Sequence, residues 1–426
     1  MTANPSPDLP LLAVAYGDRS VPMFQLLEAT SAICRVLWIV DGTEPESHGI
    51  VRPLSRFGAV VDIAGLPVTE AARLVREHRP DGIIAYRERD LSLVASLAEQ
   101  LGLQYHEPIV ARRLVDKLYQ RRALADGGLP TPSVVEVDIT DDPSLVDEIA
   151  AQVVFPVMVK PRRGNGSSYV FKAGDPQELA AIFSRCASWS NQDHEFIVEE
   201  FLEDLPELSQ AGFASFVSVE TVLVDGEIHH IATNGRLPLA DPFRETGTFI
   251  PSELDAEQTS SVLTVATDAI RALGVRNGCL HTEIKLTPNG PRVLEVNGRV
   301  GGGVADMLKL ACGLDVVALS VRVALGLPID LEDMVACPRV GYRFLYQPPV
   351  SAHVVATIEG LDRVSELPGI HRVYLQHGPG NEFDAADGSV AYLFDTVGSV
   401  SDHDALLAVV RTIRDTVSVT YGKRAS

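Results

Sequence analysis

Two glutamates and an asparagine flank a strong turn signal and could together bind a metal ion. The turn is Pro288-Asn289-Gly290, which separates two runs of residues that favour strands. Glu283 precedes Asn289 by six residues and Glu295 follows it by six, so a three- or five-residue turn centred there places the two carboxylates opposite each other. Asn297 lies two residues beyond Glu295, on the same face. Opposed carboxylates repel unless neutralised, and this oxygen-rich set suits Mg²⁺ bridging substrate phosphates.

An arginine and three consecutive glycines follow this hairpin. Arg299 lies two residues past Asn297 on the same strand face, where a guanidinium could fork onto phosphoryl oxygens. Gly301, Gly302 and Gly303 would let the backbone approach a ligand closely. The other face of the hairpin is mostly apolar and predicts core, with Thr282, Ile284, Leu286, Leu294 and Val296.

A second candidate site for phosphate is a glycine-rich loop after a strand. The strand over 154–160 ends at Lys160, and the loop contains Gly164, Gly166, Ser167 and Ser168. A new strand begins at Tyr169, so the segment differs from a P-loop, which opens a helix. Backbone N–H groups of such a loop can wrap phosphates, and the adjacent lysine supplies positive charge.

The elements that must position these groups predict an α/β and α+β multidomain protein. Short apolar runs at 11–16, 35–41, 59–63 and 81–86 alternate with helical patterns near 22–33, 68–78 and 90–101, which indicates an open parallel sheet. Later helices are expected at 255–273 and 304–326, and a closing helix at 402–417. We expect four units, at 1–110, 111–195, 196–335 and 336–426, the last a small α+β module.

Composition excludes several classes of function. Of 426 residues 46% are hydrophobic, and 36 Lys and Arg against 57 Asp and Glu give a net charge of 36 − 57 = −21. This charge argues against non-specific nucleic-acid binding and against anionic membrane surfaces. Five scattered cysteines form no metal or redox pattern, the first ten residues do not resemble a signal peptide, and no apolar run is long enough to span a membrane. We therefore expect a cytoplasmic protein.

Four features in a fixed order resemble the ATP-grasp superfamily over roughly 11–335. They are a helix lysine at Lys117, Lys160 before the glycine-rich strand pair, Glu199-Glu200-Phe201-Leu202, and the Glu283, Glu295, Asn297, Arg299 series. The last unit resembles the C-terminal domain of the L-amino-acid ligase branch at Glu359-Gly360-Leu361 and Leu367-Pro368-Gly369. The resemblance implies an ATP-grasp fold that follows a Rossmann-like N-terminal domain in the sequence. It also implies an ADP-forming ligase that joins a carboxylate to an amine through an acyl phosphate.

The resemblance also implies roles for single residues. Lys117 and Lys160 match the lysines that contact nucleotide phosphates, Gly164 to Ser168 the lid loop, and Glu199 to Leu202 the hinge that meets adenine. Glu283, Glu295 and Asn297 match the magnesium ligands, with Mn²⁺ as an alternative metal. Arg299 matches the residue that steadies the acyl phosphate.

Roles on the substrate side are less fixed. His281 matches a position near the acceptor and is a candidate catalytic residue that would help the amine to lose its proton. Gly301 and Gly302 are expected to line the substrate site. Arg244, in a loop that resembles one at the family's substrate side, could pair with a substrate carboxylate. The family's ribose-binding glutamate has no clear match here, so Glu203, Glu207 and Glu220 stay as alternatives.

The implied partners are small carboxylate and amine substrates, with amino acids as the expected class, and neither nucleic acid nor membrane. A homodimer is an open alternative. A biotin-carboxylase-like or aminoimidazole-type carboxylating enzyme is a second reading, which the ligase-type C-terminal unit disfavours. A nucleotide-binding regulator without turnover is a third, and the retained set of Glu283, Glu295, Asn297 and Arg299 argues against it.

Overall fold

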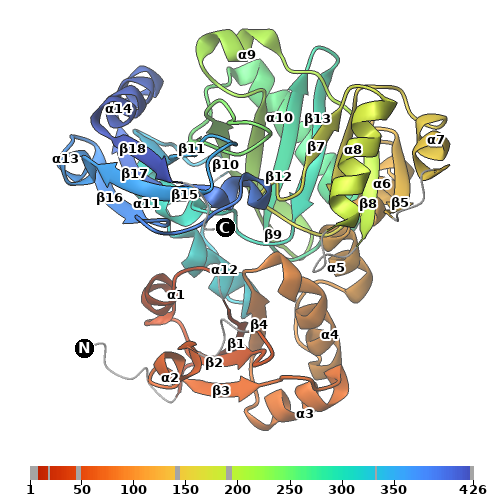
Figure 1. The fold of residues 1–426 in the computed structure, drawn as a ribbon. Coiled ribbons are helices and arrows are strands. Elements are labelled where there is room, and N and C mark those ends of the chain that lie inside the picture. The colour runs from red at the N-terminus through yellow and green to blue at the C-terminus, as the bar shows by residue number, and fades with distance from the viewer. Residues whose placement is uncertain are drawn as a thin grey trace.

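The computed structural model describes residues 8–17, 20–44, 49–139, 144–188, 194–331 and 333–422. These residues form four sheets, one of them a parallel sheet at the N-terminal end, drawn in red and orange in Figure 1. Its strands run in the order β3-β2-β1-β4 and confirm the predicted strand–helix alternation. The elements are β1 (Leu11–Ala15), α1 (Met23–Thr30), β2 (Arg35–Val40), α2 (Val51–Leu54), β3 (Ala59–Asp62), α3 (Val68–Glu77), β4 (Gly82–Ala85), the 3₁₀ turn η2 (Glu88–Asp90) and α4 (Leu91–Leu101).

A small antiparallel sheet follows, in the order β5-β8-β6-β7. Helices α7 and α8 pack with it around its own apolar core, which includes Val159, Leu179, Phe183 and Phe196. Helix α6 begins after Asp116, whose side chain accepts hydrogen bonds from the N–H groups of Leu118 and Tyr119. The elements are α5 (Pro108–Val115), α6 (Lys117–Asp126), β5 (Val134–Asp138), α7 (Ser144–Ala150), β6 (Val157–Pro161), β7 (Phe171–Ala173), α8 (Pro176–Ala187) and β8 (Glu195–Glu200).

The largest sheet has eight strands in the order β13-β12-β9-β10-β11-β14-β17-β16. Three strands from the unit expected at 336–426, namely β14, β16 and β17, therefore continue the sheet that carries the hairpin (Figure 1). Its strands are β9 (Phe216–Val224), β10 (Glu227–Arg236), β11 (Gly247–Ile250), β12 (Gly278–Thr287), β13 (Gly290–Asn297), β14 (Val340–Leu345), β16 (Ile370–Leu375) and β17 (Phe394–Val400).

The remaining elements of the chain are helices, one 3₁₀ segment and one further strand pair. They are α9 (Pro206–Ala211), α10 (Ala256–Leu273), α11 (Val304–Cys312), α12 (Val316–Ala324), α13 (Leu361–Ser365), the 3₁₀ segment η3 (Ala385–Ala391), α14 (His403–Thr416), and the paired strands β15 (Val354–Glu359) and β18 (Ser418–Gly422). No helix among the described residues is long and apolar enough to cross a membrane.

The prediction of one helix over 304–326 was wrong, because this segment forms two helices, α11 and α12. Gly313 ends α11 in the left-handed region at φ 78°, and the Asp315 side chain accepts a hydrogen bond from Ala318 N–H at the start of α12. An apolar pattern that continues across both helices conceals this break. Helix α11 packs against β11, β14 and β17 of the largest sheet. Helix α12 contacts β9 and β12 of that sheet and also β4 and α1, so α12 joins the N-terminal sheet to the largest one.

Candidate functional site

The β12–β13 hairpin places Glu283 opposite Glu295, as predicted, although the predicted turn length was wrong. Thr287 pairs with Gly290, so the turn has two residues, Pro288 and Asn289. The register then shifts between Glu283 and Ile284, which leaves Leu294 as an extra residue in β13. This bulge offsets the shorter turn and restores the opposition of the two carboxylates.

His281 lies two residues before Glu283 in β12, and each of its ring nitrogens faces a glutamate carboxylate. Its Nδ1 is 2.5 Å from Glu220 Oε1 and its Nε2 is 3.5 Å from Glu283 Oε1. Burial opposes the charged imidazole, but the charges and hydrogen bonds of Glu220 and Glu283 outweigh burial and raise the pKa of His281 to about 9. Burial also opposes the Glu283 carboxylate, but His281, Arg236 and Arg299 outweigh it and lower the pKa of Glu283 to about 2. Glu283 is therefore an anion at neutral pH.

The two lysines that were expected to contact phosphates converge on the same region. Lys117 Nζ lies 2.9 Å from Glu295 Oε1 and donates to Gly164 O at 2.8 Å. Lys160 pairs with Glu199, and Arg121 Nε donates to Glu199 Oε2 at 3.0 Å. Burial disfavours ionised Glu199, yet Arg121 and Lys160 outweigh it and lower its pKa to about 2. Both lysines are buried, so neither is an ordinary surface lysine.

The glycine-rich loop reaches from the small sheet to the C-terminal part of the chain. Gly166 adopts φ 64°, which favours glycine, and Gly166 O accepts a hydrogen bond from Ser389 N–H at 2.7 Å. Ser168 Oγ donates to Asp387 O at 2.7 Å. Ser167 has φ 57°. The loop thus rests on η3, and its role as a lid stays a prediction.

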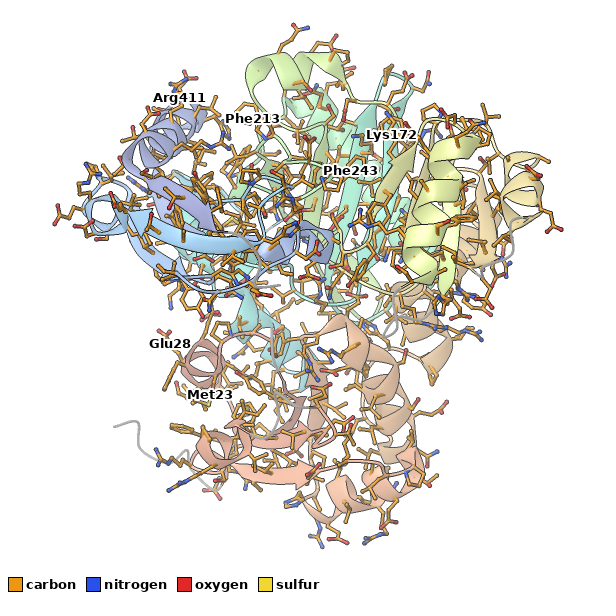
Figure 2. The ribbon with its side chains drawn as sticks, in the orientation of Figure 1. Met23, Glu28, Lys172, Phe213, Phe243 and Arg411 are labelled. Carbon is orange, nitrogen blue, oxygen red and sulfur yellow. The ribbon has the colours of Figure 1, made fainter. Side chains whose placement is uncertain are left out.

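The hinge segment leaves the end of β8. Glu200 is the last residue of that strand, and Phe201 N–H donates to Pro156 O at 3.3 Å. Lys172 of β7, labelled in Figure 2, places its Nζ 3.8 Å from the centre of the Phe201 ring. Leu202 is half-buried beside Phe201. The hinge therefore links the small sheet to the largest one, and its contact with adenine stays a prediction.

The candidate ribose glutamates lie in three different surroundings. Glu203 is exposed, and Glu207 is exposed in the first turn of α9. Glu220 is buried and accepts hydrogen bonds from His281 and from Asn234 Nδ2, the latter at 2.7 Å. The Glu220 carboxylate is therefore bonded to its neighbours in the sheet, whereas Glu203 and Glu207 are exposed to solvent.

Arg244 is buried and bonded within its own neighbourhood. Its guanidinium donates to Asp241 O at 2.7 Å, to Gln347 Oε1 at 3.2 Å and to Pro348 O at 2.8 Å. These bonds tie the loop at 241–247 to the residues after β14. The expected contact with a substrate carboxylate stays a prediction and would need some of these bonds to be exchanged.

Arg299 stands where the largest sheet meets the N-terminal sheet. Its NH2 group donates to Asn297 Oδ1 at 3.3 Å and NH1 to Val300 O at 3.3 Å, while Nε lies 3.3 Å from Glu88 Oε2. Glu88 was missed in the sequence, although a charged run directly after the buried strand β4 could have indicated it. Contacts between separate sheets leave no spacing signal in a sequence.

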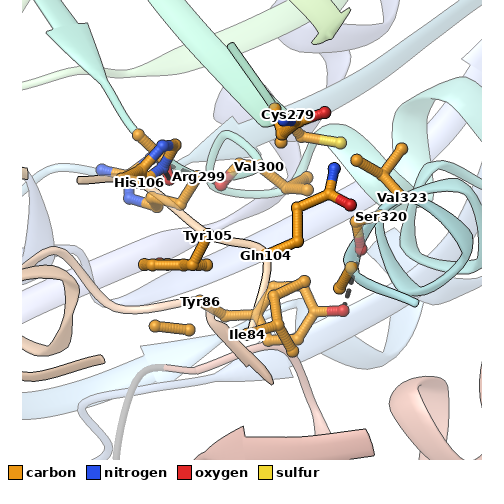
Figure 3. Close-up of a pocket in the computed structure, with 15 residues that line it drawn as sticks. Ile84, Tyr86, Gln104, Tyr105, His106, Cys279, Arg299, Val300, Ser320 and Val323 are labelled. Carbon is orange, nitrogen blue, oxygen red and sulfur yellow. Dashed lines mark hydrogen bonds between the residues drawn. The ribbon is translucent and has the colours of Figure 1, made fainter. Parts of the chain in front are cut away.

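A small cavity adjoins Arg299. Figure 3 shows Tyr86, His106, Cys279, Arg299 and Val300 around it, and about 30 Å³ of it is accessible to water-sized molecules. That volume suits ordered water and is too small for a nucleotide.

The glycines after Arg299 differ in the space around them. A Cβ on Gly301 would lie 2.3 Å from His281 Nδ1, so this position must be glycine for packing. A Cβ on Gly302 would meet no atom within 4 Å. Gly302 therefore faces open space, and the role of Gly301 and Gly302 in a substrate site stays a prediction.

Comparison with known proteins identifies the domain that carries this cluster. Residues 153–307, which include Lys160, Glu199 and the β12–β13 hairpin, match the family model described as the ATP-grasp domain. The chain contains an ATP-grasp domain. The crystal structure of L-amino acid ligase from Bacillus licheniformis has the same fold, with a TM-score of 0.77 and 22% identity over 97% of this chain and 99% of that one.

Curated relatives extend the similarity beyond the ATP-grasp domain itself. Alanine–anticapsin ligase of Bacillus subtilis (strain 168) is 27% identical over 281 residues, which are 62% of this chain and 58% of that protein. Human carnosine synthase 1 is 28% identical over 282 residues, 60% of this chain and 32% of that protein. The chain thus spans less than two thirds of the length of these curated relatives.

Proposed function

We propose that this chain is an ADP-forming ligase that joins a carboxylate to an amine through an acyl phosphate, with ATP as cosubstrate and amino acids as substrates. The observation that carries the proposal is that Glu283, Glu295 and Asn297 share one face of the hairpin, where Lys117 contacts Glu295 and Arg299 contacts Asn297. The similarity to proteins named alanine–anticapsin ligase and carnosine synthase supports the substrate class.

The donors of the hairpin fit a magnesium ion. Glu283 and Glu295 are opposed, and their side chains keep 27% and 16% of their surface exposed, so both are reachable. With Asn297 they form an all-oxygen set of the kind that Mg²⁺ prefers. When bound there, the metal would neutralise phosphate charge that these carboxylates otherwise repel. We propose Glu283, Glu295 and Asn297 as its ligands, with Mn²⁺ as an alternative metal.

Lys117 and Lys160 would bind ATP phosphates in place of the carboxylates that they contact in this structure. Lys117 and Lys160 are neutralised by Glu295 and Glu199, and a nucleotide phosphate would compete for the same charged groups. Backbone groups of Gly164, Gly166, Ser167 and Ser168 would complete the phosphate contacts. We propose the hinge from Glu199 through Glu200 and Phe201 to Leu202 for adenine, and Glu207 for the ribose.

The chemistry follows from charge and position. A carboxylate is a poor electrophile until phosphorylation supplies a good leaving group, and phosphoryl transfer depends mainly on positioning and charge neutralisation. Arg299, a planar fork, would hold the phosphoryl oxygens as charge develops on them. The loop at 163–168 would exclude water, which otherwise hydrolyses the acyl phosphate.

A matrix of substrates tests the proposal. Purified protein is incubated with ATP, Mg²⁺ and pairs of amino acids, with phosphate release and product mass measured together. We expect ADP, phosphate and a dipeptide-mass product for some pairs, and none of these from Glu295→Gln. Phosphate release that requires bicarbonate would favour the carboxylating alternative, and nucleotide binding without turnover on any pair would favour the regulator.

A further inference from the structure

Glu88 is a buried carboxylate next to the proposed active site, and its surroundings leave it unsatisfied. It lies in η2, directly after β4, with 6% of its surface exposed. Arg299 Nε is 3.3 Å from Glu88 Oε2, but neither carboxylate oxygen accepts a hydrogen bond from the described residues. Burying a carboxylate without such bonds is costly, so a further donor from water or from a ligand is expected here.

Two other acids of the N-terminal part of the chain differ from Glu88 in their hydrogen bonds. Asp90 accepts from Arg87 Nε at 2.6 Å, and Glu44 accepts from Arg87 NH1 at 2.7 Å. These two carboxylates therefore both accept hydrogen bonds from Arg87, next to the N-terminal sheet. Glu88 instead points across to the end of β13, where the acyl phosphate would form beside Arg299.

We propose that Glu88 is the base that removes a proton from the ammonium group of the acceptor amine. This inference rests on the proposed ligase function. An ammonium group supplies the N–H donors of hydrogen bonds that the two oxygens of Glu88 lack. Both ring nitrogens of His281, the earlier candidate for this task, already face the carboxylates of Glu220 and Glu283.

The step balances without an added reagent. The ammonium R–NH₃⁺ transfers one proton to a Glu88 oxygen and becomes R–NH₂. Its nitrogen lone pair attacks the acyl carbon, the bond from that carbon to the phosphate oxygen breaks, and inorganic phosphate leaves with the bonding electrons. The new amide nitrogen gives its surplus proton to that phosphate, and Glu88 later releases its own proton to solvent.

The charges that face Glu88 favour this role. Burial raises the pKa of Glu88 to about 7; Arg299 and Lys117 oppose this shift, and Glu295 and Glu283 add to it. Burial, with the charges of Asp90 and Glu88, raises the pKa of the Tyr105 hydroxyl. A base with a pKa near the working pH is effective in proton transfer. Protonation of Glu88 also removes the negative partner of Arg299, whose charge then acts fully on the departing phosphate.

Glu88→Gln tests the proposal when two acceptors are compared. An amino-acid acceptor is largely protonated at about pH 7 and needs a base, whereas hydroxylamine is largely neutral there and needs none. We expect Glu88→Gln to lose about 10² or more of the rate of peptide formation but to keep hydroxamate formation within a few-fold of wild type. Raising the pH should restore part of the peptide rate, and Glu88→Asp should retain part of it at neutral pH.

Glu253→Gln is the matched control. Glu253 is another carboxylate whose buried oxygens accept no hydrogen bond from the described residues, and it lies against Gly235. Its replacement should leave the ratio of the two acceptor rates unchanged.

Two results would overturn the role of Glu88: equal losses with both acceptors, which would indicate a structural role, or an undiminished peptide rate. If wild-type protein forms neither hydroxamate nor peptide with any carboxylate, the proposed function itself fails and the role of Glu88 with it.

Discussion

Replacing Arg121 by methionine should destabilise the protein and weaken ATP binding together. Arg121 is 1% exposed and holds two elements of the site at once. Its Nε donates to Glu199 Oε2 at 3.0 Å in β8, and its NH2 donates to Leu294 O at 2.6 Å in β13. Methionine fills most of the volume but leaves Glu199 with Lys160 as its remaining cationic partner. The hinge strand and the hairpin then lose their common anchor.

The size of the effect follows from burial. Removing one partner from a buried ion pair costs about 3–5 kcal/mol, and the lower end applies because Lys160 still neutralises Glu199. A chain of 426 residues that unfolds as one unit has an unfolding entropy of about 0.9 kcal/mol/K. A loss of about 3 kcal/mol therefore lowers Tm by roughly 3 °C.

The assay is a thermal melt with and without ATP, combined with calorimetric titration of ATP. Arg122→Met is the matched control, because Arg122 is the next residue, its side chain is 57% exposed, and its contact with Glu136 is 3.5 Å long. We expect this control to change stability by less than about 0.5 kcal/mol. Equal melting temperatures for the Arg121 and Arg122 variants would refute the reasoning about the buried triad.

Other replacements probe the remaining parts of the site. Glu295→Gln should abolish phosphate release in a folded protein, because a proposed metal ligand loses its charge; near-normal release would contradict that role. Lys160→Ala should weaken ATP binding in calorimetry, and unchanged affinity would remove Lys160 from the phosphate site. Arg299→Ala should lower kcat by about 10²–10³ with little change in apparent ATP affinity, and Arg299→Lys should restore little of the lost kcat. If Arg299→Ala changes only the KM for the carboxylate substrate, then Arg299 binds that substrate and has no catalytic role. The pKa of Glu199 falls from 4.5 in the unfolded chain to about 2 in the folded protein, so ionised Glu199 stabilises the fold fully above pH 4.5 and this stabilisation is lost as the pH falls toward 2. Denaturant unfolding of wild type and Glu199→Gln across that pH range measures the effect, and parallel curves of unfolding free energy against pH would contradict it.

Local patterns in the sequence predicted the hairpin correctly, and the reason is geometric. Alternation along a strand fixes which side chains share a face, so Glu283, Glu295 and Asn297 could be grouped before the turn was known. The turn itself was mispredicted, because Pro288-Asn289-Gly290 is compatible with several turn lengths. The bulge at Leu294 corrected the register, and a bulge has no reliable signal of its own.

Contacts between distant segments could not be predicted in the same way. Glu88 lies in η2, after β4 of the N-terminal sheet, and meets Arg299 only because the carboxyl end of β4 packs against the end of β13. The glycine-rich loop likewise rests on η3, more than two hundred residues later in the chain. Similarly, β14, β16 and β17 extend the largest sheet, although their sequence predicts only short strands with turns between them. Such pairings depend on tertiary packing rather than on periodicity.

Transfer of oxygen from the substrate carboxylate to phosphate tests the central claim most directly. The purified protein is given ATP, Mg²⁺, an acceptor amino acid and a donor amino acid whose carboxylate carries oxygen-18, and the released phosphate is analysed by mass spectrometry. Formation of an acyl phosphate requires one carboxylate oxygen to leave with the phosphate, so we predict one labelled oxygen in each phosphate formed with product. Product formation with unlabelled phosphate would contradict the proposed mechanism.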